Sequence, residues 1–285
     1  MRIWILGGKG MLAGICAKMC MQKKWQCIVD DRFLADITDY DPLLQRARFI
    51  QPTHIINCAA YTHVDQAEKN PEIAFLVNAT GAFFVAKVAK FINAHLMHIS
   101  TDYVFSGDQQ APYCEEDTPC PLNMYGASKL EGENLVLDIH PSACILRTSW
   151  VFGAKGKNFI SSLLPLLQNQ EEIDVVQDQW GCLTYCYDLA SIILHLSLIR
   201  EKGMYHFVNQ GVCSRFDIAK ELFEKLQDRI FCKKIVPTSA SNYVNMAKRP
   251  RFNVLGTQKI SKKLNKTPRH WKEALGEFLL DAITV

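Results

Sequence analysis

A glycine-rich turn between a short apolar strand and a helix is the feature that most restricts the fold of this chain. The run Ile3–Leu6 has the length of a strand, Gly7 and Gly10 follow it, and Met11–Gln22 reads as a helix. Gly7 permits a tight turn, Gly10 lets a phosphate approach the backbone, and the small Ala13 allows close packing of helix on strand. The helix N-terminus adds amide donors and the positive end of its dipole. The sequence therefore predicts an opening strand–helix unit that binds a dinucleotide.

Short apolar runs alternate with helical stretches through the first half of the chain. The predicted strands are Ile3–Leu6, Cys27–Val29, His54–Asn57, Leu96–Ile99 and Ala143–Leu146. The predicted helices are Met11–Gln22, Pro42–Phe49, Pro71–Ala94 and Tyr125–Leu137. Such alternation predicts an α/β fold, a doubly wound parallel sheet with helices on both faces. Ligands of such sheets lie at the carboxyl ends of the strands.

Composition excludes several classes of protein. The formal net charge is +3 and 21% of the residues are charged, so we expect neither a nucleic-acid nor a membrane-surface partner. No run approaches the roughly 20 apolar residues of a membrane span, and no signal peptide is recognisable. The eleven cysteines form no metal-ligand cluster, so we expect reduced thiols, no metal and a cytoplasmic location.

The end of the second strand carries two opposed signals about the cofactor. Asp30, twenty residues after Gly10, is placed to accept hydrogen bonds from a free ribose 2′-hydroxyl. Arg32, two residues later, suits a 2′-phosphate instead. We therefore expect both NADH and NADPH to be accepted, with NADPH preferred.

Tyr125 and Lys129 form the candidate catalytic pair. A spacing of four places both side chains on one face of a helix. A nearby ammonium lowers the pKa of a phenol by roughly 1–3 units, which would make Tyr125 a useful general acid. Thr101, at the end of the fourth strand, can offer its hydroxyl to the same substrate oxygen.

Twelve Lys and Arg residues and no acid lie between Arg229 and Lys272. This bias allows two interpretations, a solvated basic surface or a pocket for a diphosphate. For the second, Lys248, Arg249 and Arg251 are the candidate ligands.

Together these motifs closely resemble the extended short-chain dehydrogenase/reductases and, within them, the dTDP-4-dehydrorhamnose reductase family. The resemblance covers nearly the whole chain and rests on the glycine turn and on the segments 57–65, 100–105, 125–131, 147–152, 178–181, 237–239 and 249–250. Related 4,6-dehydratases carry Thr-Asp-Glu where this chain has Thr101-Asp102-Tyr103, so the resemblance favours simple reduction over elimination.

The resemblance implies a role for each matching residue. Tyr125 would donate the proton, Lys129 would bind the nicotinamide ribose, and Thr101 would assist. Asp102, Trp150 and Arg249 would bind the substrate. The residues implied for the cofactor are Gly7, Gly10, Met11, Leu12, Asp30, Arg32, Asp36, Ile37, Ala60, Tyr61, Thr62, Tyr125 and Lys129.

The implied architecture is a Rossmann NAD(P) domain over residues 1–150 and a smaller, interleaved C-terminal α/β substrate domain over 151–285, with residues 185–200 returning to the first. The implied reaction is NAD(P)H-dependent reduction of dTDP-6-deoxy-L-lyxo-4-hexulose to dTDP-L-rhamnose. Two alternatives stay open: reduction of another nucleotide 4-keto sugar, and a non-catalytic NADP-binding regulatory subunit. A nucleotide sugar is the expected partner, and a homodimer is left open.

Overall fold

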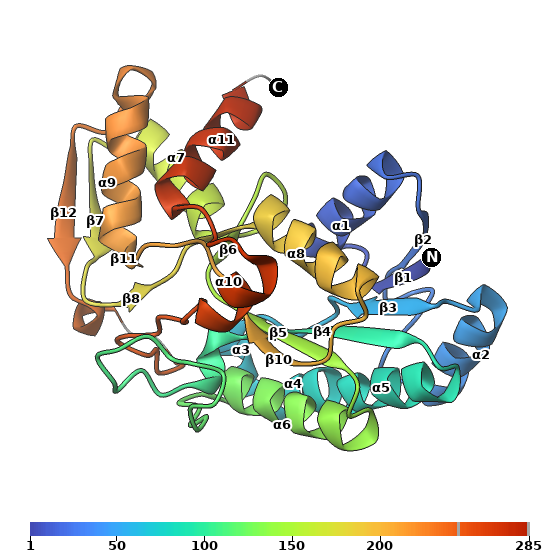
Figure 1. Ribbon diagram of the computed structural model, residues 1–285. Helices are drawn as coiled ribbons and strands as arrows, with labels where there is room; N and C mark the ends of the chain where they lie inside the picture. Colours follow the sequence, from blue (N-terminus) through green and yellow to red (C-terminus); the bar gives the residue numbers. More distant parts are fainter. Residues whose placement is uncertain (244–245, 284–285) are drawn as a thin grey trace.

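The computed structural model describes residues 1–243 and 246–283, and a six-stranded parallel sheet is its centre (Figure 1). The strands run in the order β10-β5-β4-β3-β1-β2. Their bounds are β1 (Arg2–Leu6), β2 (Gln26–Asp30), β3 (His54–Asn57), β4 (His95–Thr101), β5 (Cys144–Thr148) and β10 (Gly203–His206). All neighbouring strands in this sheet pair in parallel. The predicted doubly wound parallel sheet is confirmed.

Helices cover both faces of the sheet (Figure 1). On one face, α1 (Met11–Gln22) and α8 (Cys186–Leu198) pack over a core that includes Ile5 and Met97. The other face carries α2 (Tyr40–Ile50), α5 (Ala82–Phe91) and α6 (Met124–Ile139) over a core that includes Trp4. Shorter helices join them: α3 (Val64–Lys69), α4 (Pro71–Phe75), the π-helix η1 (Leu76–Gly81) and the 3₁₀ turn η2 (Asp102–Val104).

The continuous helical run Pro71–Phe91 corrects the expectation that no segment is long and apolar enough to span a membrane. Its mean hydropathy of 1.5 passes that test by length and composition. Half of its apolar window is buried in the fold. Val85, Ala86 and Ala89 pack in the core under the sheet, which gives this helix its apolar composition.

A second core lies in the C-terminal half. There β7 (Glu172–Val176) pairs in parallel with β12 (Lys234–Thr238), and α7 (Phe159–Asn169), α9 (Arg215–Leu226) and α11 (Trp271–Ile283) pack around them (Figure 1). The remaining elements are β6 (Val151–Phe152), β8 (Trp180–Gly181), β9 (Thr184–Tyr185), β11 (Cys213–Ser214), η3 (Gln227–Arg229), η4 (Ala240–Asn242) and α10 (Gln258–Leu264). The division at residue 150 stays a prediction; α8 and β10, later in the chain, lie on the central sheet.

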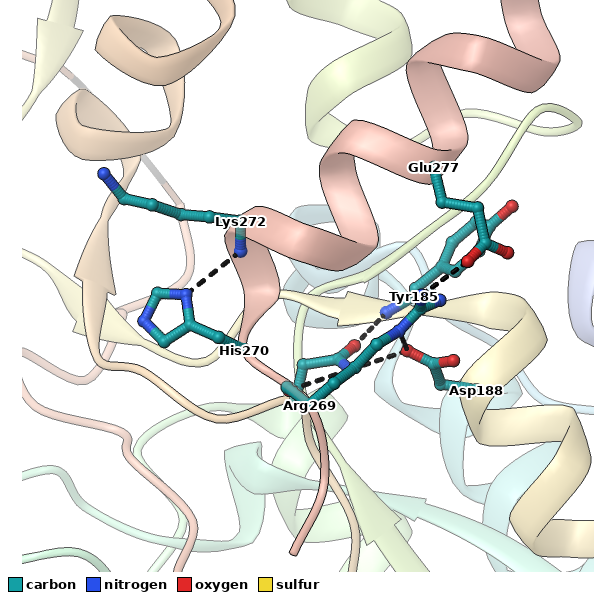
Figure 2. Close-up of polar contacts among 7 residues, drawn as sticks. Tyr185, Asp188, Arg269, His270, Lys272 and Glu277 are labelled. Atoms are coloured by element: carbon teal, nitrogen blue, oxygen red, sulfur yellow. Dashed lines mark hydrogen bonds and ion pairs between the residues drawn. The ribbon is translucent and has the colours of Figure 1, made fainter.

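Arg269 links α8 on the sheet to α11 of the second core. Figure 2 shows its guanidinium between Asp188 and Glu277. Its Nε donates to the Asp188 carboxylate at 2.8 Å, and the Nδ2 of Asn209 donates to the same oxygen at 2.7 Å. Hydrogen bonds to a charged group stabilise by about 1.5–3 kcal/mol each. We infer that this network fixes the two packed bodies against each other.

Candidate active site

A pocket of about 350 Å³ opens at the carboxyl ends of β1, β2 and β3, where a doubly wound sheet binds its ligand. Eight residues predicted for the cofactor line it: Gly7, Gly10, Arg32, Asp36, Ile37, Ala60, Tyr61 and Thr62. Seven further residues line it without having been predicted: Lys9, Asp31, Ala35, Thr38, Cys58, Ala59 and Val77.

The glycine turn has the shape that a pyrophosphate needs. Gly7 has φ +84°, and a Cβ at that position would lie 2.7 Å from the backbone nitrogen of Ala59. No side chain caps the N-terminus of α1, so the amides of its first turn, which begins with Met11 and Leu12, are not satisfied by a cap. Free amides at the positive end of a helix dipole are donors for phosphate. These residues fit a dinucleotide.

Asp30 requires a correction. Its side chain is 1% exposed and does not line the pocket. Its carboxylate accepts hydrogen bonds from Trp4 Nε1 at 2.9 Å and from the Arg46 guanidinium at 2.8 and 3.0 Å. Both carboxylate oxygens therefore already accept hydrogen bonds from within the fold. The structure does not support the expected contact of the Asp30 side chain with the ribose. Its neighbour Asp31 lines the pocket instead.

Two cations stand at the mouth of the pocket. The ammonium of Lys9 lies 3.3 Å from a carboxylate oxygen of Asp31, and Arg32 Nε lies 3.0 Å from Asp36. The side chain of Arg32 is 82% exposed, so it can turn toward a ligand at small cost. Lys9 and Arg32 are the groups that could meet a 2′-phosphate.

The predicted catalytic residues meet where β4 ends and α6 begins. Asn123 caps α6 by accepting from the Gly126 amide at 2.8 Å, which places Tyr125 in the first turn. A Cβ at Gly126 would lie 2.1 Å from the carbonyl oxygen of Tyr103, so glycine is what allows α6 to approach η2. The Tyr125 ring lies edge-on to the Tyr103 ring, with 5.7 Å between centroids. The Thr101 hydroxyl donates to Asp102 at 3.0 Å and lies close enough to the phenol of Tyr125 to affect its pKa.

Two hydrogen-bonded chains connect α6 with the loop that lines the cofactor pocket. In the first, Lys129 Nζ lies 3.3 Å from His98 Nε2, His98 Nδ1 lies 3.2 Å from the Asn57 amide, and Asn57 Oδ1 accepts from the backbone of Ala59. In the second, Asn78 accepts from the Tyr61 amide at 2.8 Å and donates to the Ser128 hydroxyl at 3.0 Å. The catalytic pair and the cofactor pocket are thus held as one unit.

The electrostatics of the pair differ from the sequence expectation. Burial raises the pKa of the Tyr125 phenol above its ordinary value, and the neighbouring Asp102 and Tyr103 raise it further, while the nearby Thr101 hydroxyl lowers it. Lys129 does not lower it, because its ammonium donates to the carbonyl of Ile99 at 2.7 Å and faces His98. Burial lowers the pKa of Lys129 to about 8.

Asp102 is 2% exposed, and internal partners surround its carboxylate. It accepts from Thr101 Oγ1 at 3.0 Å, from Ser149 Oγ at 2.8 Å and from Asn253 Nδ2 at 2.8 Å. Burial nevertheless raises its pKa to about 6. The geometry makes Asp102 a tie between β4, β5 and the C-terminal segment; its predicted contact with substrate stays a prediction.

The basic stretch from Arg229 to Lys272 does not form one cationic pocket. Seven of its twelve cations pair with acids from other segments within the described residues: Lys233, Lys234, Arg249, Lys259, Lys263, Arg269 and Lys272. Arg249 is among them, because its guanidinium contacts both carboxylate oxygens of Asp65. The excess of positive charge in this stretch is mostly neutralised in the fold.

Comparison with known proteins decides the family. The model of a family described as RmlD substrate binding domain matches residues 1–283. A dTDP-4-dehydrorhamnose reductase from Aggregatibacter actinomycetemcomitans is 36% identical over 96% of this chain and 97% of its own length. The crystal structure of a Bacillus anthracis dTDP-4-dehydrorhamnose reductase in complex with NADP superposes with a TM-score of 0.94 at 36% identity, over 98% of this chain and 99% of that one.

The chain belongs to the dTDP-4-dehydrorhamnose reductase family. This confirms the resemblance inferred from the motifs. A dTDP-4-keto-6-deoxy-D-glucose reductase from Streptomyces niveus is also similar to this family member, at 35% identity over 95% of this chain and 94% of its own length.

The sequence does not predict a role for three residues that lie at or near the candidate site of this family member. Asn78 lies in the π-helix η1 inside an apolar run, and a π-turn in a helix often marks a functional position. His98 lies in the buried strand β4, where it reads as a core residue. Arg215 follows the N-cap Ser214 of α9 and reads as an ordinary first-turn residue. The capping pattern predicts the helix, but no sequence pattern shows what the three side chains face.

Proposed function

We propose that this protein catalyses NADPH-dependent reduction of the C4 keto group of dTDP-6-deoxy-L-lyxo-4-hexulose to dTDP-L-rhamnose. The observation that carries the proposal is the pair of hydrogen-bonded chains that join the neighbouring residues Ser128 and Lys129 of α6 to the loop of the cofactor pocket. A proton donor and a dinucleotide pocket in one rigid unit suit reduction of a carbonyl.

In this proposal each residue has one task. Bound NADPH supplies the hydride. Tyr125 gives its phenolic proton to the substrate oxygen, Thr101 hydrogen-bonds that phenol, and Lys129 binds the nicotinamide ribose. Gly7, Gly10 and the first turn of α1 hold the pyrophosphate.

The remaining assignments for the cofactor are proposals of the same kind. Arg32 and Lys9 favour NADPH, and Asp36, Ile37 and residues 60–62 line the adenosine side. NADH is accepted more weakly. Trp150 and Asp102 lie on the substrate side. We also propose a cytoplasmic protein without nucleic-acid or membrane partners; light scattering of the purified protein would measure whether it is a homodimer.

The decisive experiment measures NADPH oxidation with and without the keto sugar, and identifies the product by mass spectrometry. Oxidation only with the keto sugar, and its loss in Tyr125→Phe, are expected. Binding of NADPH without turnover on any 4-keto sugar would favour the regulatory-subunit alternative.

A second candidate is reduction of a different nucleotide 4-keto sugar. The similarity to the Streptomyces niveus dTDP-4-keto-6-deoxy-D-glucose reductase favours including that sugar in the assay. The ratio of kcat/KM values between the two keto sugars distinguishes the candidates.

A further inference from the structure

A second pocket, of about 350 Å³, lies in the C-terminal half between α7, β7 and the start of α9. Phe159, Leu163 and Leu166 give it an apolar wall, Arg215 and Arg249 bring two guanidinium groups to its lining, and Asp174 adds one carboxylate. An apolar wall beside cations suits a ligand with a ring at one end and phosphates next to it.

Arg215 is a cation held between two aromatic rings. Its guanidinium carbon lies 4.6 Å from the ring centre of Trp150 and 4.8 Å from that of Phe159. This arrangement fixes the plane of the guanidinium and leaves its edge, which carries the N–H donors, free to bind.

Among the described residues no carboxylate forms an ion pair with Arg215, and Asp102 acts on its charge only from a longer distance. Within residues 1–243 and 246–283, no hydrogen bond or ion pair of its guanidinium is found. It is also the first residue of α9, where the helix dipole is positive and disfavours a cation. Burial lowers its pKa. A desolvated cation in such a place is costly unless an anion joins it.

Trp150, which carries one face of this arrangement, has a strained backbone. Its φ is +41°, a left-handed value that is rare for a large side chain. Gly181 leaves room for the ring, since a Cβ there would lie 2.8 Å from it. Strain of this kind persists where the surrounding fold enforces it, and it concentrates at functional sites.

Tyr103 lies near both the catalytic Tyr125 and the two arginines of this pocket. The Tyr103 ring lies edge-on to the Tyr125 ring, with 5.7 Å between centroids, and the Tyr103 phenol lies near the guanidinium of Arg249. Arg215 is close enough to Tyr103 to lower the pKa of its phenol, although burial raises that pKa overall. A sugar at Tyr125 would therefore have its phosphates on the side of Arg215.

We propose that Arg215 binds the diphosphate of the nucleotide sugar, with Trp150 and Phe159 orienting its guanidinium, and that Arg249 only positions the surrounding loop. Three of the five N–H donors of Arg249 are already committed, to Asp65 at 2.7 and 3.1 Å and to the carbonyl of Ala247. The inference rests on the proposed function, because it takes a nucleoside diphosphate as part of the substrate.

The test compares binding of dTDP and of thymidine by calorimetry in wild type, Arg215→Gln and Arg215→Lys. Arg229→Gln, an exposed arginine at the other end of the same helical segment, is the matched control. In Arg215→Gln the affinity for dTDP should fall about 10- to 100-fold. Thymidine and NADPH affinities should stay within about twofold, and NADPH binding also reports that the variant is folded. Arg215→Lys should lose less, because it keeps the charge.

An unchanged dTDP affinity in Arg215→Gln would overturn the proposal, as would equal losses for dTDP and thymidine, which would mean that Arg215 only shapes the pocket. Failure of wild type to bind dTDP would overturn it too. Binding of dTDP that depends on Arg215, without reduction of any keto sugar, would refute the proposed function alone. Reduction with dTDP binding independent of Arg215 would refute this inference alone.

Discussion

Lys129 faces His98, with 3.3 Å between the lysine Nζ and the imidazole Nε2. The hydrogen bonds of Asn57 with Ala59 and His98 decide which nitrogen of His98 carries the hydrogen. Asn57 Oδ1 accepts from the Ala59 amide, so the NH₂ group of Asn57 faces His98 Nδ1. His98 Nδ1 must then accept, and a neutral imidazole carries its hydrogen on Nε2.

This arrangement opposes a proton on Lys129. If Lys129 is protonated, its ammonium and the Nε2–H of His98 are both donors and cannot form a hydrogen bond with each other. A neutral Lys129 amine can accept a hydrogen bond from Nε2–H. Burial already favours the neutral amine, and it lowers the pKa of Lys129 to about 8, although Glu133 and Cys58 act in the other direction. His98 is therefore a positioning residue that tunes the lysine.

The first prediction concerns His98→Gln. Glutamine can turn its carbonyl oxygen toward the ammonium, so the pKa of Lys129 should rise. The alkaline limb of kcat/KM, which reports the free enzyme, should move upward from about pH 8. His95→Gln, at the opposite end of β4, is the control and should leave the limb in place. A limb that does not move in His98→Gln would contradict this role.

The second prediction concerns the stability of the cofactor-free protein. The folded-state pKa of Lys129 is about 8 and its reference value is 10.5, so between these values the unfolded chain binds more protons. The free energy of unfolding should therefore gain a contribution that rises with pH across this window. Lys129→Met should lose that contribution and most of the turnover. Denaturant unfolding from pH 7 to 11 measures it, and an identical pH dependence in both proteins would show that Lys129 is not perturbed.

Much of the fold could be predicted because local rules decide it. The glycine turn and the alternation of apolar runs with helical stretches place α1, α6 and all strands of the central sheet except β10 within a few residues. The sequence predicts a strand at Tyr205–Val208, two residues later than β10, because the pairing of β10 with β5 decides its bounds. In the second half, the sequence predicts a helix over Arg215–Leu226 and a strand over Glu172–Val176, and α9 and β7 have these bounds.

The side-chain partners could not be predicted, because they depend on contacts between distant segments. Asp30 has the sequence position of a ribose ligand. In the fold its carboxylate instead accepts hydrogen bonds from Arg46 of the next helix and Trp4 of the first strand. The Tyr-x-x-x-Lys spacing places two residues on one face of a helix. It cannot show that the Lys129 side chain contacts His98. Arg249 likewise finds Asp65 only in the folded chain.

The third prediction is that Tyr125→Phe loses turnover about 10²- to 10⁴-fold while NADPH affinity stays nearly unchanged, because the variant lacks only the acidic proton. Single-turnover rates and fluorescence titration with NADPH measure the two quantities. Rates close to wild type would remove Tyr125 from the mechanism.

The fourth prediction separates the two former candidates for the ribose. Arg32→Ala should weaken NADPH more than NADH, because the exposed Arg32 lines the pocket and can meet a 2′-phosphate. Asp30→Asn should instead weaken both cofactors alike and lower the free energy of unfolding by about 1–3 kcal/mol, since it disrupts a buried hydrogen-bonded pair. A selective gain of NADPH over NADH in Asp30→Asn would restore Asp30 to the ribose site.

The fifth prediction concerns the ion pair between Arg249 and Asp65, which ties the C-terminal loop to α3. If Arg249 positions the loop, Arg249→Met and Asp65→Asn should raise KM for the nucleotide sugar by similar factors, and the double variant should be no worse than either. The pair is partly exposed, so we expect a coupling of about 0.5–1 kcal/mol in stability. Arg249 holds the pKa of Asp65 below its usual range, so this coupling is present at neutral pH and is lost as the pH falls through the folded-state pKa of Asp65. A large rise of KM in Arg249→Met with none in Asp65→Asn would mean that Arg249 touches the diphosphate itself.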